Sequence, residues 1–194
     1  MQLVALAVVA LVLAASPRRL TAPVDMTLFT WDASVDCWAT RRHVPALGAD
    51  VTVEVYPESP GAAVSPRQAA VIAALDHLPP DFRDRLDDAA EVNREEFDEL
   101  VDLKSCGLGH INRTNIREHY SLPSLIIPPL NRVRGDYFFL AGNCDWEEEH
   151  GIEMIVKDGG VVRCTANDCA YMASDWGDAV ERGWVRKLMR RLRP

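Results

Sequence analysis

Hydrophobic and polar residues alternate over residues 51–56, with valines on one face and Thr52, Glu54 and Tyr56 on the other. This period-two pattern predicts a half-buried strand. Residues 27–38 are rich in β-forming and aromatic residues and predict an earlier strand that begins near Met26. A stretch containing Pro45, Gly48 and Asp50 supplies the turn between these strands.

Two helices are predicted next. Ser65 followed by Pro66 is a typical helix start, and the first helix then runs to Pro79-Pro80. Asp81 is the expected N-cap of a second helix that reaches about Leu103. One face of this helix is apolar at helical spacing: Phe82, Leu86, Ala89, Ala90, Phe97, Leu100 and Val101. The opposite face is acidic: Asp84, Asp87, Asp88, Glu91, Glu95, Glu96, Asp98 and Glu99.

Strand patterns return in the last third of the chain. Residues 125–127 are followed by Pro128-Pro129 and predict an edge strand or a bulge, whereas the apolar run 137–141 predicts a central strand. Residues 152–156 and 161–165 flank an Asp-Gly pair and predict a hairpin. Strands, helices and then strands predict a single α+β domain with an antiparallel sheet flanked by helices, without βαβ winding. A basic helix over residues 176–191 is expected to close the chain, either on the sheet or at a membrane surface.

The first residues allow several interpretations. An apolar run over residues 3–15 is too short to span a hydrocarbon core of ~30 Å as a helix. Positive charge follows this run, at Arg18 and Arg19, whereas a signal peptide carries it in front. Residues 1–25 are therefore an extension from a misassigned start, a signal or anchor within residues 1–15, or a buried helix. We expect a domain over residues 26–194 in the cytoplasm, with export as the alternative, because five cysteines would leave an exported form with an unpaired thiol.

Charge is distributed unevenly along the chain. The net charge is −8, yet the last thirteen residues hold six basic groups and no acidic one. Residues 26–181 hold 13 basic and 28 acidic groups. A body this acidic repels nucleic acid and favours a basic protein partner, although solubility alone would also explain it.

One loop, residues 142–151, concentrates reactive side chains. Residues 144–151 carry a thiol, an indole, an imidazole and four carboxylates: Cys144, Trp146, His150, Asp145, Glu147, Glu148 and Glu149. As one helical turn, the loop would place Trp146 and His150 on one face, with Trp146 on the core and Gly151 in the left-handed position at the end. Glu149 is then expected to orient His150 by a carboxylate–imidazole hydrogen bond.

Three interpretations of this loop remain open. In a catalytic site, Glu149 and His150 would act as acid and base, with Cys144 as a nucleophile. In a binding site, Asp145, Trp146, Glu147 and Glu148 would contact a partner. In a structural loop, Glu149 and His150 would tie two strands together.

Metal ligands are a weaker possibility. Cys106 and His110 are four positions apart, and Cys164 and Cys169 five, so that each pair resembles half of a zinc site. Neither pair has the tight spacing of structural zinc sites, and reduced buried thiols are the simpler expectation. We therefore expect no metal and no cofactor, and a disulfide only in an oxidising compartment.

Residues 144–152 also resemble the signature of an uncharacterised bacterial domain family, in which Cys-x-Trp-x-x-Glu-His-Gly is followed by Leu or Ile. The resemblance covers about residues 27–165, and it implies no established activity. It is compatible with immunity proteins that neutralise toxins. The sequence therefore predicts a non-catalytic binding module of acidic, immunity type. The alternatives are a small enzyme using Glu149 and His150, or an exported or membrane-tethered protein.

Overall fold

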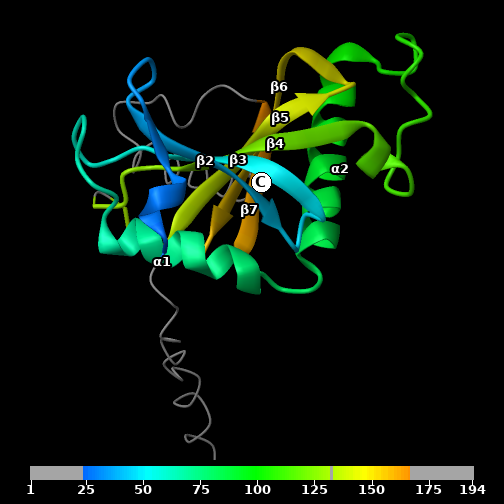
Figure 1. Ribbon diagram of the computed structural model, residues 1–194. Coiled ribbons are helices and arrows are strands. Elements are labelled where there is room, and N and C mark those ends of the chain that lie inside the picture. The colour runs from blue at the N-terminus through cyan, green and yellow to red at the C-terminus, as the bar shows by residue number, and fades with distance from the viewer. Residues whose placement is uncertain (1–23, 132, 167–194) are drawn as a thin grey trace, which may run out of the picture.

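Seven strands form one sheet whose spatial order follows the chain order (Figure 1). The computed structural model describes residues 24–131 and 133–166 of the 194-residue chain. Neighbouring strands are antiparallel except for β3 and β4, which are parallel. The strands are β1 Thr30–Asp32, β2 Cys37–Val44, β3 Ala49–Val55, β4 Tyr120–Ile127, β5 Tyr137–Cys144, β6 Glu147–Lys157 and β7 Gly160–Ala166.

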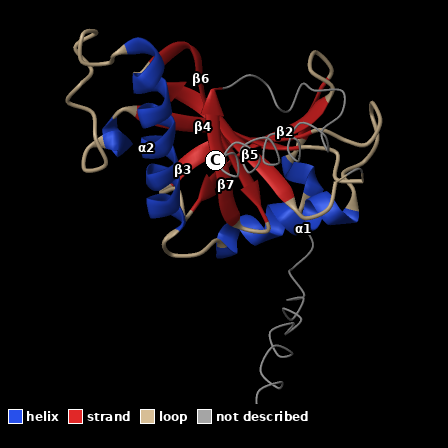
Figure 2. Cartoon of the chain, turned by 180° about the vertical axis from the view of Figure 1, so that it is seen from behind, coloured by secondary structure: helices blue, strands red, loops and turns tan. Residues whose placement is uncertain are grey.

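Two α-helices occupy the long connection between β3 and β4: α1 Pro66–Ala74 and α2 Phe82–Val101 (Figure 2). Three short 3₁₀ helices accompany them: η1 Met26–Leu28, η2 Leu75–His77 and η3 Ile116–Glu118. A parallel pair of strands needs such a crossover. The prediction of a wholly antiparallel sheet was therefore wrong at this pair, and the domain is dominated by its sheet.

Both helices lie over the same face of the sheet. Phe82 of α2 packs against Phe138 of β5, with ring centroids 6.3 Å apart. On the opposite half of the sheet, Arg42 of β2 donates to the Ile72 carbonyl of α1. Arg42 lies opposite Val51, and the buried valines of β3 share its face, so one part of the core lies between this face of the sheet and the two helices. Ile126 and Phe139 point to the other face and are buried as well.

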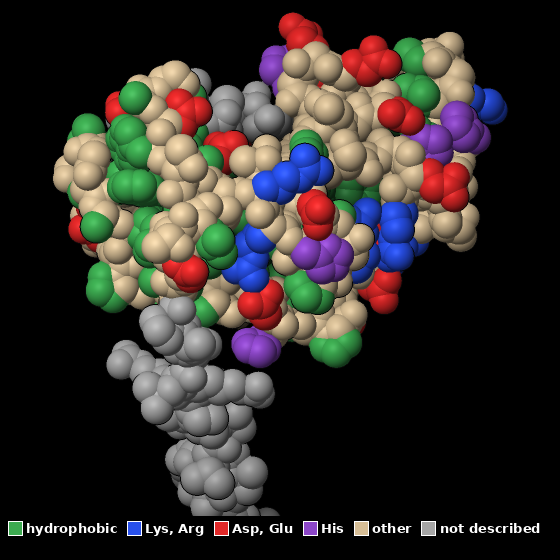
Figure 3. Space-filling model, viewed as in Figure 1, with side chains coloured by type: hydrophobic (Ala, Val, Ile, Leu, Met, Phe, Trp, Pro, Cys, Tyr) green, Lys and Arg blue, Asp and Glu red, His purple; other side chains and the backbone are tan. Residues whose placement is uncertain are grey.

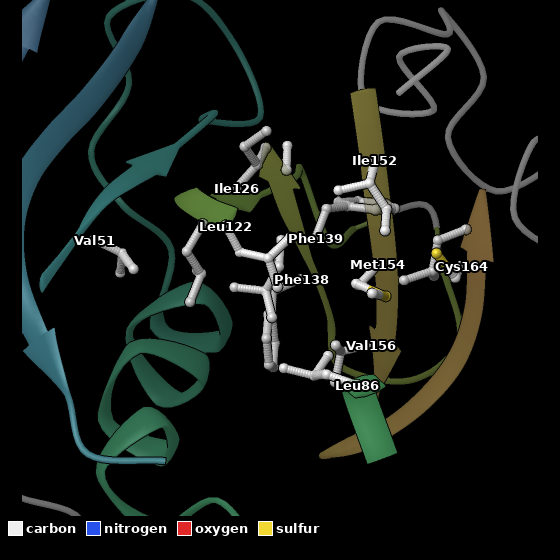
Figure 4. Packing of buried hydrophobic residues seen from close by; sticks show 14 of the residues in the cluster. Val51, Leu86, Leu122, Ile126, Phe138, Phe139, Ile152, Met154, Val156 and Cys164 are labelled. Carbon is white, nitrogen blue, oxygen red and sulfur yellow. The ribbon is translucent and has the colours of Figure 1, made fainter. Parts of the chain in front are cut away.

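The core of this layer is shown in Figure 4, where Leu86 of α2 lies close to Phe138 and Val156 of neighbouring strands. Phe138 and Val156 are opposite each other in the register of β5 and β6. The predicted central position of β5 is confirmed, since it lies between β4 and β6. The hairpin of β6 and β7 is confirmed as well, with Asp158 and Gly159 at positive φ in its turn.

Several local predictions need correction. Residues 27–38 are a 3₁₀ turn, a short strand and the start of β2 rather than one strand, because the chain turns at residues 33–36. Residues 125–127 belong to β4, the fourth strand of the seven, rather than to an edge strand. Pro128 and Pro129 follow the last residue of β4, and Pro123 lies where the register between β4 and β5 shifts. These prolines therefore remove no hydrogen bond from a regular part of the sheet.

The helix starts were predicted with mixed success. The predicted N-cap at Ser65 is confirmed, and Ser65 and Gln68 form a complete capping box at the start of α1. Asp81 stands at the N-cap position of α2, but its side chain makes no cap hydrogen bond and accepts from Arg85 instead. At the other end, Leu100 is 81% exposed and Val101 is exposed, so that the apolar face of α2 does not stay on the sheet to its last turn.

The apolar run at residues 3–15, the predicted basic helix 176–191 and Cys169 lie outside the described residues. Within the described part of the chain, no helix is both long enough and apolar enough to cross a membrane.

Candidate functional site

The reactive loop is a tight β-hairpin rather than a helical turn. Strand β5 ends at Cys144, β6 begins at Glu147, and these two residues are opposite each other. Only Asp145 and Trp146 lie between them. The hairpin divides the reactive residues between the core and the solvent: Cys144 and Trp146 are buried, whereas Asp145 and residues 148–150 are exposed.

Two glycines make this hairpin possible. A Cβ atom on Gly142 would lie 1.8 Å from the Ser121 carbonyl oxygen, and one on Gly151 would lie 2.2 Å from the Gly142 carbonyl oxygen. Gly151 also has φ +70°, which confirms its predicted left-handed conformation. The position lies inside β6, however, and not at the end of a helical turn. Strands β4, β5 and β6 approach each other here more closely than any side chain would allow.

Trp146 points into the core, as predicted. It is 2% exposed, and its Nε1 donates to Asn93 Oδ1 of α2 at 3.0 Å. Its ring meets that of Tyr120 edge-on, with centroids 6.5 Å apart. Such burial does not suit a residue that contacts a partner, and the indole instead fixes the turn to α2.

Cys144 is buried beside Trp146. Its Sγ lies 3.8 Å from the Glu147 carbonyl oxygen. Desolvation, with a smaller contribution from the Glu147 carboxylate, raises the pKa of the Cys144 thiol to about 12. A thiol with this pKa stays protonated at neutral pH, whereas the thiolate is the nucleophile. The geometry therefore gives Cys144 a structural role and not that of the predicted nucleophile.

His150 pairs with Glu147 and not with Glu149. Its Nδ1 lies 3.3 Å from Glu147 Oε1, and its backbone N–H donates to the same oxygen at 3.2 Å. The predicted Glu149–His150 bond was wrong, because the carboxylate that contacts the His150 ring and its backbone N–H is that of Glu147. Glu148, Glu149 and His150 are exposed. Figure 3 shows carboxylates gathered at the end of the molecule where β5 and β6 meet.

A second contact joins the turn to the segment before β4. Asp145 Oδ2 lies 2.8 Å from His119 Nδ1, and the Asp145 backbone N–H donates to the His119 carbonyl oxygen at 3.0 Å. The ring of His110 lies edge-on to that of His119, with centroids 5.2 Å apart. We call Asp145, His119 and His110 the histidine cluster. Sequence reasoning missed His119, because nothing in a spacing of 26 residues from Asp145 signals a contact.

On the core side of the same segment lies a network that we call the Asp87 cluster. Asp87 of α2 is 1% exposed and accepts a hydrogen bond from the Tyr120 hydroxyl at 2.6 Å and others from the Arg117 guanidinium. Arg83 and Arg113 approach the same carboxylate at 3.7 Å. Burial, followed by the hydrogen bond to Asp87, raises the pKa of Tyr120 well above its usual value.

The Asp87 cluster changes the interpretation of the acidic helix face. Asp87 is buried instead of solvated, and Asp84 and Asp88 pair with Arg117 and Arg113 at 3.1 and 2.5 Å. The hydrogen bonds that Arg113 and Arg117 donate to Asp88 and Asp87, respectively, raise the pKa values of the two guanidinium groups. Farther along α2, Arg94 pairs with Glu91 at 3.0 Å. Much of the charge of this face is therefore neutralised by arginines that are distant in sequence or one turn away.

Of the predicted zinc ligands, Cys106, His110 and Cys164 lie among the described residues, and Cys169 lies outside them. Cys106 is exposed and lies 4.0 Å from the Ser105 hydroxyl, whereas Cys164 is buried. Desolvation raises the pKa of the Cys164 thiol well above its usual value. Over residues 24–131 and 133–166, no group of three or more His, Cys, Asp or Glu side chains is placed to hold a metal ion.

A groove elsewhere in the domain lies between residues 24–29, β2 and the end of α1, with a volume of about 730 Å³. Arg42 crosses it and is held by Asp76 at 2.6 Å and by the Ile72 carbonyl oxygen at 3.2 Å. Both guanidinium nitrogens in these contacts are already engaged by the protein, so the groove offers a weaker site than the hairpin.

Comparison with known proteins places the chain in a family without assigning an activity. A family model described as a domain of unknown function, DUF6985, matches residues 27–172, which is most of the chain. No curated protein and no solved structure matches it. The matched region includes every described strand and both helices. The chain therefore belongs to the DUF6985 family of domains of unknown function.

Proposed function

We propose that this protein is a non-catalytic binding module that presents the β5–β6 turn to a basic protein partner. The observation that carries the proposal is the division of the turn between two environments. Cys144 and Trp146 are buried and support the turn, while Glu148 and Glu149 are exposed. The thiol and the indole thus support the turn from inside, and the carboxylates of Glu148 and Glu149 form its charged exterior.

The exterior of the turn carries negative charge that is not neutralised by an arginine or lysine of the described part of the chain. Among the described residues, Glu148 and Glu149 form no ion pair, and Asp145 keeps 57% of its side chain exposed while it contacts His119. Charges in this situation attract an oppositely charged surface during encounter and fix its orientation. The acidic face of α2 is a weaker candidate, because its aspartates around Asp87 already have arginine partners.

The turn is also rigidly placed. The Trp146–Asn93 bond ties it to α2, and the Asp145–His119 contacts tie it to the segment before β4. Gly142 and Gly151 allow close backbone packing beneath it. A surface that is ordered before binding loses less conformational entropy when a partner arrives. Such pre-organisation suits recognition by a small number of carboxylates.

Catalysis has less support than binding. The high pKa of Cys144 removes the nucleophile from the predicted set, and Glu149 does not orient His150. The remaining pair, Glu147 and His150, lies within one exposed strand end. Acid–base catalysis needs further groups that position a substrate against such a pair.

The most specific form of the proposal is an immunity-type protein that neutralises a basic toxin or effector in the cytoplasm. It rests on the acidic turn and on the loop signature Cys144–Ile152. A cytoplasmic location fits the protonated, buried thiols of Cys37, Cys144 and Cys164, which are free cysteines.

A comparison of charge variants tests the proposal. The wild-type protein and the double variant Glu148→Gln/Glu149→Gln are used to capture proteins from an extract of the native host, at about 50 mM and about 300 mM salt. The matched control, Glu58→Gln/Glu99→Gln, removes the same charge from exposed positions away from the turn.

We expect a basic protein that the wild type and the control retain at low salt and that the turn variant loses. Equal retention by all three proteins would contradict the turn as the binding surface. Retention that no salt concentration weakens would contradict the electrostatic basis of the proposal.

A further inference from the structure

The histidine cluster has a property that the binding proposal does not use. Each of its two imidazoles is held at Nδ1: His110 by the Gly107 carbonyl oxygen at 3.1 Å, and His119 by Asp145 Oδ2 at 2.8 Å. Both partners are oxygen acceptors. Each ring is therefore fixed through its own Nδ1, and its Nε2 takes no part in these two hydrogen bonds.

The nature of the partners sets the tautomer. A carbonyl oxygen only accepts hydrogen bonds, and so does an ionised carboxylate, so each Nδ1 must carry the proton and donate. In the neutral imidazole the lone pair then lies on Nε2. A histidine whose Nδ1–H is held by a carboxylate or a backbone carbonyl while Nε2 stays free is the common arrangement at protein metal sites.

The separation of the rings fits a shared ion. With metal–nitrogen distances of ~2.0–2.1 Å, two imidazoles on one tetrahedral ion have ring centroids roughly 5 Å apart. The centroids of His110 and His119 are 5.2 Å apart, with their planes at 73°.

Electrostatics near the cluster does not oppose a cation. The neighbouring arginines of the segment, Arg113 and Arg117, are paired with aspartates of α2. Asp145 adds a negative charge directly behind His119.

We propose that His110 and His119 form a binding site for a divalent transition metal ion of the zinc type, with Asp145 as the residue that orients His119. Imidazole nitrogen is a preferred ligand of such ions. Because the described residues gather no set of three or more ligands, the protein supplies two, and water or a ligand from outside completes the coordination. This site shares Asp145 with the β5–β6 turn, but it does not rest on the proposed recognition of a basic partner.

Titration of the full chain with zinc chloride, followed by calorimetry, tests the site. We expect one ion per chain in a site that His110→Asn and His119→Asn each weaken by at least about tenfold. Asp145→Asn should weaken it about 10–100-fold, because the ring loses its charged acceptor. His43→Asn and His77→Asn, at exposed histidines outside the cluster, serve as matched controls and should leave the affinity unchanged.

A second measurement does not depend on the stability of the variants. NMR of the wild-type protein with isotope-labelled histidine should show the Nδ1–H tautomer at His110 and His119 before zinc is added. Zinc should then shift the Nε2 resonances of both rings together.

Either of two results would overturn the proposal: zinc affinity that survives both cluster variants, or Nε2 resonances that do not move. Zinc binding that Cys106→Ser abolishes and His119→Asn preserves would also overturn it, in favour of a thiolate site.

Discussion

The Asp87 cluster and the histidine cluster lie along the same segment, residues 110–120, yet they differ in how completely their polar atoms are used. Asp87 is buried and accepts from Tyr120 and Arg117, with Arg83 and Arg113 close by. In the histidine cluster, His119 contacts Asp145 and His110 contacts the Gly107 carbonyl oxygen, each through Nδ1. The Nε2 atom of each ring takes no part in these two contacts. A buried and fully paired network stabilises the fold, whereas the histidine cluster, in which the His119 side chain is 16% exposed and that of Asp145 57%, is less buried and only partly paired.

The β5–β6 turn repeats this difference over a few residues. Trp146 and Cys144 are inside, where the indole N–H and the thiol have protein partners. Glu148 and Glu149 are outside, where their carboxylates face water. The comparison predicts that substitutions inside change the stability of the fold, and that substitutions outside change binding.

The largest effect is expected at the Asp87 cluster. Asp87→Ala should lower the free energy of unfolding by about 3–5 kcal/mol, because it leaves the Tyr120 hydroxyl and the arginines without their buried acceptor. Urea denaturation measures this change. Asp84→Ala is the matched control: Asp84 pairs with the same Arg117 but is 67% exposed, and its loss should cost about 0–1 kcal/mol. Equal losses for the two variants would contradict the distinction between buried and exposed partners.

A smaller loss is expected at the support of the turn. Trp146→Phe keeps an aromatic ring in the core but removes the donor to Asn93 Oδ1, and we expect a loss of about 1–3 kcal/mol in the free energy of unfolding. Asn93→Ala should have a similar effect. The double variant should lose less than the sum of the two, as measured by a double-mutant cycle from urea denaturation. Strict additivity would show that the bond does not hold the turn.

Alkaline pH should weaken the fold through the buried thiols. Burial raises the pKa values of Cys37 and Cys144 from their usual 9.0 to about 11 and about 12. At a pH above 9.0 and below about 11 for Cys37 or about 12 for Cys144, the thiol has lost its proton in the unfolded chain but keeps it in the folded chain. The free energy of unfolding therefore falls as the pH rises above about 9. Denaturation at several pH values measures this fall, which Cys144→Ala should reduce.

Thiol alkylation provides the accompanying control. In the native protein at about pH 8, the exposed Cys106 should react, whereas Cys144 should react only after unfolding. Rapid alkylation of native Cys144 would contradict its structural role.

The smallest effect on stability is expected at the exterior of the turn. Glu148→Gln/Glu149→Gln should change the free energy of unfolding by no more than about 0.5 kcal/mol, because neither carboxylate forms an ion pair with a described residue. Thermal unfolding followed by circular dichroism measures the change. A large destabilisation would mean that these carboxylates support the fold and would remove the distinction between the two sides of the turn.

The sequence predicted those features that depend on local chemistry. The Ser65 N-cap and the Asp158–Gly159 turn each follow from neighbouring residues alone. The predicted burial of Trp146 is confirmed, although the helical turn from which it was predicted does not form.

The errors have a different origin, because they depend on distant partners. Whether Asp87 is solvated depends on Arg117 and Tyr120, which are about 30 residues away. The partner of Asp145 is His119, which is 26 residues away. The prediction of a helical turn was wrong because the hairpin depends on the close approach of Gly142 to Ser121 of the neighbouring strand. Periodicity within a short loop contains no information about such contacts.

Site-directed photo-crosslinking in the native host tests the central claim most directly. A photoreactive phenylalanine analogue replaces Asn143, which is exposed beside the turn, or Ser59, which is exposed in the loop before α1. Both positions leave the carboxylates of the turn in place. The account predicts a discrete adduct with a basic protein from position 143 and none from position 59. No adduct from position 143, or the same adduct from both positions, would contradict it.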